Sequence, residues 1–283
     1  HDSFARELKQ YADKIGTKKN KLIRLNNVEN GMFLVTIPSE RFSDLVVSRE
    51  IEERIERLLV EYRNREKLRQ YGLSNRRKIL IEGRPGTGKT FTASVIASEL
   101  DLPLYTVQMD KVVTKFMGET SAKLRQIFDA ISTTTGVYFF DEFDAIGADR
   151  SLDNEVGEAR RILNSFLQFI EQDTSDSIII AATNNQKLLD QALFRRFDDV
   201  LHYAMPTSDE VKRLFETRLS AFDDFFTVSD DVIDMAAKLS HAEIIRVCDD
   251  AIKNSILTNA PIDNDYLLKL LKDRISAYVA KEA

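Results

Sequence analysis

Two hydrophobic patterns divide the chain. Between residues 79 and 203, five short apolar runs are separated by stretches that are each long enough for a crossover helix. The runs are Ile79–Ile81, Leu104–Val107, Val137–Phe140, Ile178–Ala182 and Val200–Tyr203. Uninterrupted apolar strands are typical of a parallel sheet whose two faces are both covered by helices. The pattern therefore predicts a three-layer α/β unit.

Past Pro206 the strand pattern stops and helical spacing replaces it. Thr207 and Glu210 match a capping box at a helix start, and apolar residues then recur every three or four positions. These residues are Val211, Leu214, Phe215 and Leu219, then Ile244, Ile245, Cys248, Ala251 and Ile252, and finally Tyr266, Leu267, Leu270, Leu271 and Ile275. Residues 206–283 are therefore predicted to form a small all-helical domain after an α/β unit of residues 38–205.

Residues 1–37 are predicted to form a separate N-terminal segment. Apolar residues from Phe4 to Ile15 have helical spacing, and the β-prone runs Leu22–Leu25 and Met32–Ile37 favour a hairpin. A heavily charged helix follows and is expected to continue towards Tyr71. Its predicted apolar face is Ile51, Ile55, Leu58, Leu59 and Tyr62.

Composition excludes several classes of protein. The 283 residues are 43% hydrophobic and 30% charged, which is ordinary for a soluble globular protein, and the net charge of -6 makes nucleic acid an unlikely partner. The single cysteine, Cys248, cannot form an internal disulfide and favours a reducing cytoplasm. No apolar run approaches the roughly 20 residues of a membrane helix. We expect a cytoplasmic protein without a transmembrane segment.

A glycine-rich loop joins the first core strand to the next helix. Successive glycines let backbone N–H groups point at one anion, and the helix N-terminus adds partial positive charge. In this pattern Lys89 reaches the outer phosphates and Thr90 offers its hydroxyl to Mg²⁺. A tight structural turn is the alternative. Residues 83–90, however, match the phosphate-binding loop pattern at every fixed position and lie between a strand and a helix, which favours nucleotide binding. The candidate binding residues are Gly83, Arg84, Pro85, Gly86, Thr87, Gly88, Lys89, Thr90 and Phe91.

Polar residues end two further core strands. Asp141 and Glu142 follow Val137–Phe140, at the strand ends where α/β sheets bind ligands. Asp141 is expected to hold hydrated Mg²⁺, and Glu142 to orient the attacking water. Asn184, after Ile178–Ala182, is a candidate sensor of the γ-phosphate. The alternative for Asp141 and Glu142 is that they only cap the next helix, and the alternative for Asn184 is an ordinary turn residue.

With these strand ends, residues 40–280 resemble the AAA family of ATPases, in particular its katanin-, spastin- and FtsH-like single-ring motors. Gly83–Thr90, Phe140–Asp144 and Ala181–Asn185 are similar to the family's Walker A, Walker B and sensor 1 motifs. The resemblance implies a P-loop NTPase fold with a helical lid, ATP and Mg²⁺ as cofactors, ATP hydrolysis, and a homo-oligomeric ring of six subunits.

The resemblance also implies further nucleotide contacts. Phe42–Val47 looks like the segment that flanks the adenine, which gives Asp44, Val46 and Val47 as candidates. In the lid, Ser240–Glu243 stands where the family often has glycine-alanine-acid, so His241 and Ala242 are candidates, although a capped helix start is the alternative. Arg84 departs from the family's usual proline and alters the electrostatics near the phosphates.

Two segments resemble parts of the family that act between subunits or on a substrate. Arg195 and Arg196 match the arginine fingers, which reach the γ-phosphate of the neighbouring subunit. The alternative is a solvated face with surface salt bridges. Lys115, Phe116 and Met117 resemble the first pore loop, in which Phe116 and Met117 would grip an extended polypeptide. The alternative is that both are core residues of a helix.

Three classes of function compete. The pore-loop resemblance favours a motor that unfolds, translocates or remodels proteins, with a separate protease or adaptor docking on residues 1–37. Seven basic residues between Arg63 and Lys78 raise the alternative of a nucleic-acid motor or loader, although they also suit a solvated helix face. A scaffold ring that binds ATP only to assemble has no need of Glu142.

Overall fold

The computed structural model describes residues 31–113, 118–143, 153–184, 194–220, 222 and 226–282. The expected helix from Phe4 to Ile15 and the run Leu22–Leu25 lie outside these residues. The strands are β1 (Phe33–Thr36), β2 (Lys78–Gly83), β3 (Leu104–Val107), β4 (Val137–Phe140), β5 (Ile178–Thr183) and β6 (Asp199–Tyr203). The helices are η2 (Phe42–Asp44), α2 (Arg49–Arg63), α3 (Arg65–Gln70), α4 (Lys89–Glu99), α5 (Met109–Val112), α6 (Glu119–Thr133), α7 (Asp153–Gln172), α9 (Ser208–Leu219), α10 (Asp230–Ala236), α11 (His241–Thr258) and α12 (Asn264–Glu282).

The six strands form one sheet in the order β1-β3-β4-β5-β2-β6. The five strands from β2 to β6 pair in parallel, which confirms the predicted parallel α/β unit. Each of the five apolar runs is a strand, with bounds that differ by at most a residue or two from the run itself. In this order β2 lies between β5 and β6, so its loop leaves the sheet beside the ends of both neighbours.

Strand β1 differs from the expectation of a separate N-terminal segment. It pairs antiparallel with β3, with Phe33 opposite Val107, and extends the parallel sheet at its edge. Met32 and Val35 are buried in the same core as Tyr105. Residues 32–36 therefore belong to the α/β sheet, because the hydrophobic side of this short run is covered by the sheet's own core.

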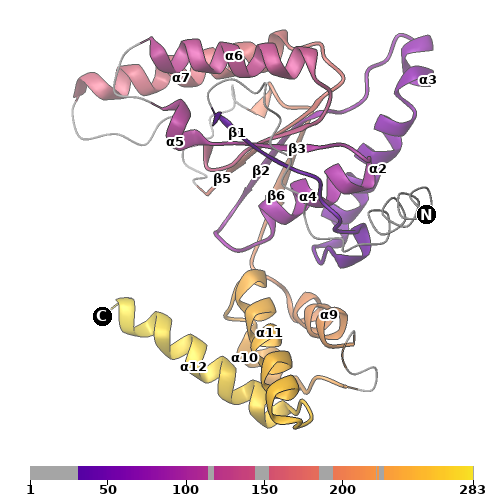
Figure 1. The fold of residues 1–283 in the computed structure, drawn as a ribbon, viewed down its shortest axis with the longest axis vertical. Coiled ribbons are helices and arrows are strands. Elements are labelled where there is room, and N and C mark those ends of the chain that lie inside the picture. The colour runs from indigo at the N-terminus through magenta and orange to yellow at the C-terminus, as the bar shows by residue number, and fades with distance from the viewer. Residues whose placement is uncertain are drawn as a thin grey trace, which may run out of the picture.

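Alternate side chains of the central strands supply two different cores. Ile79 and Ile81 lie in the core shared with α2 and α4, whereas Leu80 lies in the core shared with α6 and α7. Figure 1 shows α6 and α7 along one side of the sheet and α2 and α4 along the other. Because both faces are covered, both sets of side chains must be apolar, which explains the uninterrupted runs.

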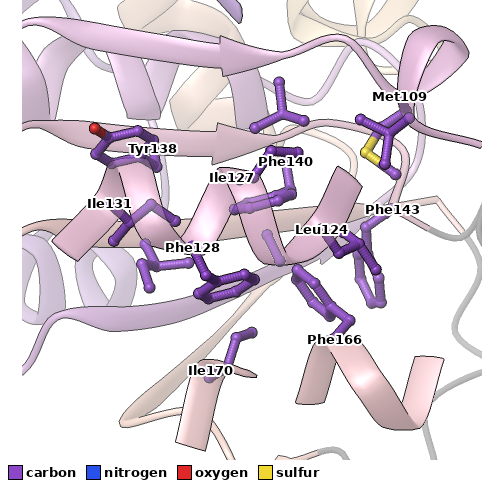
Figure 2. Close-up of a cluster of buried hydrophobic side chains, with 14 of the residues drawn as sticks. Met109, Leu124, Ile127, Phe128, Ile131, Tyr138, Phe140, Phe143, Phe166 and Ile170 are labelled. Carbon is purple, nitrogen blue, oxygen red and sulfur yellow. The ribbon is translucent and has the colours of Figure 1, made fainter. Parts of the chain in front are cut away.

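Aromatic rings fill the core beneath α6 and α7 (Figure 2). The Phe140 ring, at the end of β4, meets Phe166 of α7 edge-on, with 5.0 Å between ring centroids. Phe143 stacks on the same Phe166 ring at 5.9 Å. The two residues between Phe140 and Phe143 are therefore held between two buried anchors.

Helix α2 has the predicted apolar face but ends earlier than predicted. All five residues expected to face inward from α2 are buried, and Ser48 caps the helix by accepting a hydrogen bond from the Ile51 N–H. The helix does not run on to Tyr71: Asn64 leaves the helical conformation, with φ -105° and ψ 15°, and α3 starts at Arg65.

The last four helices, α9 to α12, pack around a third core and form the unit drawn in orange to yellow in Figure 1. The predicted capping box starts α9: the Glu210 N–H donates to Thr207 Oγ1, and the Thr207 N–H donates to Glu210 Oε2. Among the described residues, no helix is both long enough and apolar enough to cross a membrane.

Candidate active site

A cavity of about 360 Å³ lies between the carboxyl ends of the sheet strands and the helical unit. Its lining comes from the loop after β2, the ends of β4 and β5, the segment before α2, and helices α9 and α11. The lining residues are Asp44, Leu45, Val46, Pro85, Gly86, Gly88, Lys89, Thr90, Phe91, Asp141, Glu142, Asn184, Leu214, His241, Ala242 and Ile245. Most residues singled out from the sequence therefore meet around one cavity.

The glycine-rich loop is held by close backbone contacts. A Cβ atom at Gly83 would lie 2.5 Å from the carbonyl oxygen of Tyr203, so the loop leaves β2 only because no side chain is present there. Gly86 has φ +77°, in the left-handed region that favours glycine. Thr87 is fully buried, and its hydroxyl donates to the Arg84 carbonyl at 2.8 Å. Gly83, Arg84 and Thr87 thus shape the loop from behind the cavity.

Lys89 is the cation at the centre of the loop. Its Nζ donates to the carbonyl oxygens of Gly83 at 2.8 Å and Arg84 at 2.9 Å. It also donates to Asn184 Oδ1 at 2.7 Å, which joins the loop to the end of β5. Only 7% of Lys89 is exposed, so the site keeps a positive charge in a largely desolvated place. Such a charge attracts anions more strongly than one in water.

A hydroxyl and a carboxylate form a second polar pair beside Lys89. Thr90 Oγ1 donates to Asp141 Oδ2 at 3.1 Å, so the start of α4 and the end of β4 are in contact. Oxygen atoms are the ligands that Mg²⁺ prefers, and the ion usually takes only one or two from protein because water and phosphate supply the rest. Among the described residues no cluster of three or more His, Cys, Asp and Glu side chains could hold a metal ion. The pair therefore fits Mg²⁺ bound together with a phosphate ligand.

Glu142 occupies an unusual backbone conformation next to this pair. Its φ is +49°, a left-handed value that is uncommon for a residue with a side chain. The Glu142 N–H donates to Asp141 Oδ1 at 3.0 Å, and its side chain is exposed and lines the cavity. The buried Phe140 and Phe143 rings on either side fix this turn. Strained conformations that persist in this way are often found at functional sites.

The helical unit closes the cavity from the other side. Ser240 caps α11 by accepting a hydrogen bond from the Glu243 N–H, and the Ala242 N–H donates to the Gly86 carbonyl at 3.0 Å. One backbone hydrogen bond therefore joins the phosphate loop to the helical unit. His241 lies between Ser240 and Ala242 in the sequence. It lines the cavity with Ala242, as the resemblance implied.

Apolar side chains make up much of the remaining lining of the cavity. Asp44 and Val46 line the cavity as expected, but Val47 does not, because it is 2% exposed and packs into the core beneath α2. Leu45, Leu214 and Ile245 also line the cavity and were not among the sequence candidates. The sequence pattern placed Leu214 and Ile245 on apolar helix faces, and the structure shows that both also border the cavity.

The two candidate arginine fingers lie outside this cavity. Arg195 is exposed, whereas Arg196 forms an ion pair with Glu171 at the end of α7. Lys115, Phe116 and Met117 lie outside the described residues. The two arginines are therefore not part of the cavity lining that the described residues of one chain form.

Known proteins with similar sequences are consistent with a nucleotide site in this cavity. Residues 79–205 match the sequence model of the "ATPase family associated with various cellular activities (AAA)". The chain is 37% identical, over 78% of its length, to an uncharacterized AAA family ATPase, y4kL, of Sinorhizobium fredii. The chain belongs to the AAA family of ATPases.

Other relatives of this AAA chain have names that describe proteolytic systems. It is 29% identical over 90% of its length to an ATP-dependent zinc metalloprotease FtsH of Mycoplasmopsis synoviae. It is 31% identical over 62% of its length to a proteasome-activating nucleotidase of Methanosphaerula palustris. The AAA chain spans 66% of the y4kL protein, 40% of the FtsH protein and 45% of the nucleotidase.

Proposed function

We propose that this AAA chain binds ATP with Mg²⁺ in the cavity, hydrolyses it, and works in a ring that remodels polypeptides. The observation that supports hydrolysis best is the meeting of Lys89, Thr90, Asp141, Glu142 and Asn184 at one end of the cavity. A binding-only site does not need Glu142 in a strained turn beside the phosphate loop.

Each residue has a separate task in this proposal. Lys89 exchanges its carbonyl acceptors for phosphate oxygens, and Asn184 Oδ1 keeps the ammonium aimed at them. Mg²⁺, held by Thr90 and Asp141, would neutralise charge on the phosphates. The Glu142 carboxylate accepts a hydrogen bond from the attacking water and orients it. The adenine would pack on the apolar side chains that line the cavity, namely Leu45, Val46, Leu214 and Ile245, together with Asp44 from the same segment as Leu45.

We further propose that hydrolysis is completed between neighbouring chains. Arg195 is exposed and absent from its own cavity, so its guanidinium is available to the phosphates of an adjacent subunit. A guanidinium supplied in trans stabilises the charge that builds on the transferred phosphoryl group. Arg196 already pairs with Glu171 and has the smaller part. In the family such rings contain six subunits.

A mixing experiment tests this proposal directly. Glu142→Gln lacks the water-orienting carboxylate but keeps Arg195, whereas Arg195→Ala keeps a complete cavity but lacks the finger. Each variant alone is expected to be nearly inactive, and mixing them is expected to restore ATP turnover. The double variant, mixed with Arg195→Ala in the same way, is the control that must stay inactive. Two inactive variants whose mixture is also inactive would contradict action in trans.

Polypeptide is the proposed substrate, and nucleic acid is disfavoured. Four of the seven basic residues between Arg63 and Lys78 form ion pairs with acids of the same chain, namely Arg63, Arg69, Arg76 and Arg77. A patch neutralised in this way offers little to a phosphate backbone. Turnover should therefore rise with an unfolded protein and not with DNA, and Phe116→Ala should remove the response to protein. DNA stimulation that falls steeply with salt would reverse this assignment.

A further inference from the structure

His241 is a buried polar side chain that nothing in the described part of the molecule satisfies. Only 6% of the residue is exposed, and neither Nδ1 nor Nε2 has a hydrogen-bond partner among the described residues. Buried polar atoms are nearly always hydrogen-bonded, and each exception calls for an explanation such as a missing ligand. Because His241 also lines the cavity, a ligand in the cavity is the natural partner.

The first turn of α11 holds this imidazole in place. The preceding residue, Ser240, caps the helix, and the following residue, Ala242, donates its N–H to the Gly86 carbonyl. The backbone that carries His241 is therefore fixed relative to the phosphate loop, and burial limits the freedom of its side chain. A group that is positioned before the ligand arrives pays little conformational entropy when it binds.

The chemistry of the surroundings favours a neutral partner atom. Burial lowers the pKa of His241, and the nearby carboxylate of Glu210 opposes this shift only in part. A neutral imidazole has one N–H donor and one acceptor nitrogen. The phosphate end of the cavity already has Lys89, Thr90 and Asp141, whereas His241 comes from the lid side with the apolar Leu214 and Ile245.

We propose that His241 is a specificity-determining residue that hydrogen-bonds the nucleoside part of the bound nucleotide, through a ribose hydroxyl or the edge of the base. The inference rests on the proposed nucleotide site and adds what that site selects. Since an imidazole offers a donor and an acceptor, it favours ligands whose polar groups match both and penalises those that leave one nitrogen unpaired.

The test compares three substitutions of this residue by calorimetric titration. His241→Phe keeps a planar ring without nitrogen, His241→Asn restores a polar atom near the position of Nδ1, and His241→Gln restores one near Nε2. We expect His241→Phe to bind ADP about tenfold more weakly than wild type. Either Asn or Gln should recover most of that loss, and the one that does identifies the nitrogen in use.

Ligand variants distinguish the ribose from the base. If a ribose hydroxyl is the partner, 2′-deoxy-ADP or 3′-deoxy-ADP loses affinity for wild type but not for His241→Phe. If the base edge is the partner, GDP instead binds wild type more weakly than ADP does, and this difference disappears in His241→Phe. Inorganic tripolyphosphate, measured by competition, has no nucleoside and should bind wild type and His241→Phe equally.

Two results would overturn the inference. One is equal ADP affinity of wild type and His241→Phe. The other is a parallel loss of ADP and tripolyphosphate binding, which would mean that the substitution disturbs the phosphate loop. Lys89→Ala separates this inference from the proposed function: if Lys89→Ala binds ADP far more weakly than wild type, the nucleotide site stands whatever His241 does. If the wild-type chain binds no nucleotide, both the proposed function and the inference about His241 are wrong.

Discussion

The two sides of the cavity are built on different principles. On the sheet side, Lys89, Thr90, Asp141 and Asn184 are joined to one another or to the loop by hydrogen bonds between 2.7 and 3.1 Å. On the helical side, Leu214 and Ile245 offer apolar surface, and the Ala242 N–H makes the one backbone bond to the loop described above. The sheet side is suited to chemistry on the phosphates, and the helical side to selection and closure.

This comparison predicts that substitutions on the sheet side remove activity, whereas substitutions on the helical side reduce nucleotide affinity only in part. The largest effect is expected for Glu142→Gln. The amide keeps the shape but cannot accept a proton, so turnover should fall by about 10²- to 10⁴-fold. Nucleotide affinity should change little. Steady-state turnover and ADP titration measure the two, and Glu216→Gln on the exposed face of α9 is the control.

Lys89→Ala comes next. Removal of a buried ammonium that bonds phosphate oxygens should weaken ATP binding by roughly 100-fold, because hydrogen bonds to charged groups contribute about 1.5–3 kcal/mol each. Titration with a fluorescent ATP analogue measures the loss. Lys253→Ala, which removes a lysine paired with Asp250 on the helical unit, should bind like wild type. Near-normal affinity of Lys89→Ala would show that the backbone alone holds the phosphates.

Gly86→Ala tests the junction between the two sides. An added Cβ would lie 2.5 Å from Ser240 Oγ, on a backbone with φ +77°. We expect a lower melting temperature and about tenfold weaker nucleotide binding, because the clash pushes α11 away from the loop. Gly72→Ala is a matched control: its φ is +72° and a Cβ there meets nothing within 4 Å, so it carries the backbone strain without the clash. Equal affinity of the two variants would contradict a role for the junction.

The smallest effect is expected for Ile245→Ala. A base that packs on Ile245 buries part of this side chain, and its loss should weaken ATP binding about fivefold, or about 1 kcal/mol. Ile256→Ala lies on the same helix, is 60% exposed in wild type, and is outside the cavity, so it should have no effect. The ratio of the two affinities isolates the packing of the base from any general effect on α11.

The sheet side could be predicted from sequence because its residues follow recognisable strands. The carboxyl ends of parallel strands meet at one edge, so a lysine, an acid pair and an asparagine at three such ends had to lie close together. The loop needs glycine where its backbone approaches Tyr203 and Ser240, and these positions stand out in the sequence. Local pattern and tertiary placement agree for all of them.

The helical side was less predictable because apolar residues look alike whether they line a core or a ligand. Val47 was expected at the nucleotide and lies in the core. Leu214 and Ile245 were expected only on apolar helix faces: Leu214 lies in the helical core and also lines the cavity, whereas Ile245 is 36% exposed and lines the cavity. Strand β1 was likewise expected outside the sheet, since a short run does not reveal which edge it joins. These outcomes depend on how segments far apart in the sequence pack together, and a local sequence pattern does not reveal that packing.

Strand β1 also determines how the chain would carry a mechanical load. The carbonyl of Met32 accepts a hydrogen bond from the Gln108 N–H at 2.8 Å, and that of Gly31 accepts one from Lys111 Nζ at 3.0 Å. Tension applied at Gly31 therefore acts first on Lys111 of α5, which lies four positions ahead of Lys115 in the sequence, and then on the pairing of Phe33 with Val107. A pull at residue 31 would therefore load an element that directly precedes, in the sequence, the residues proposed to grip the substrate.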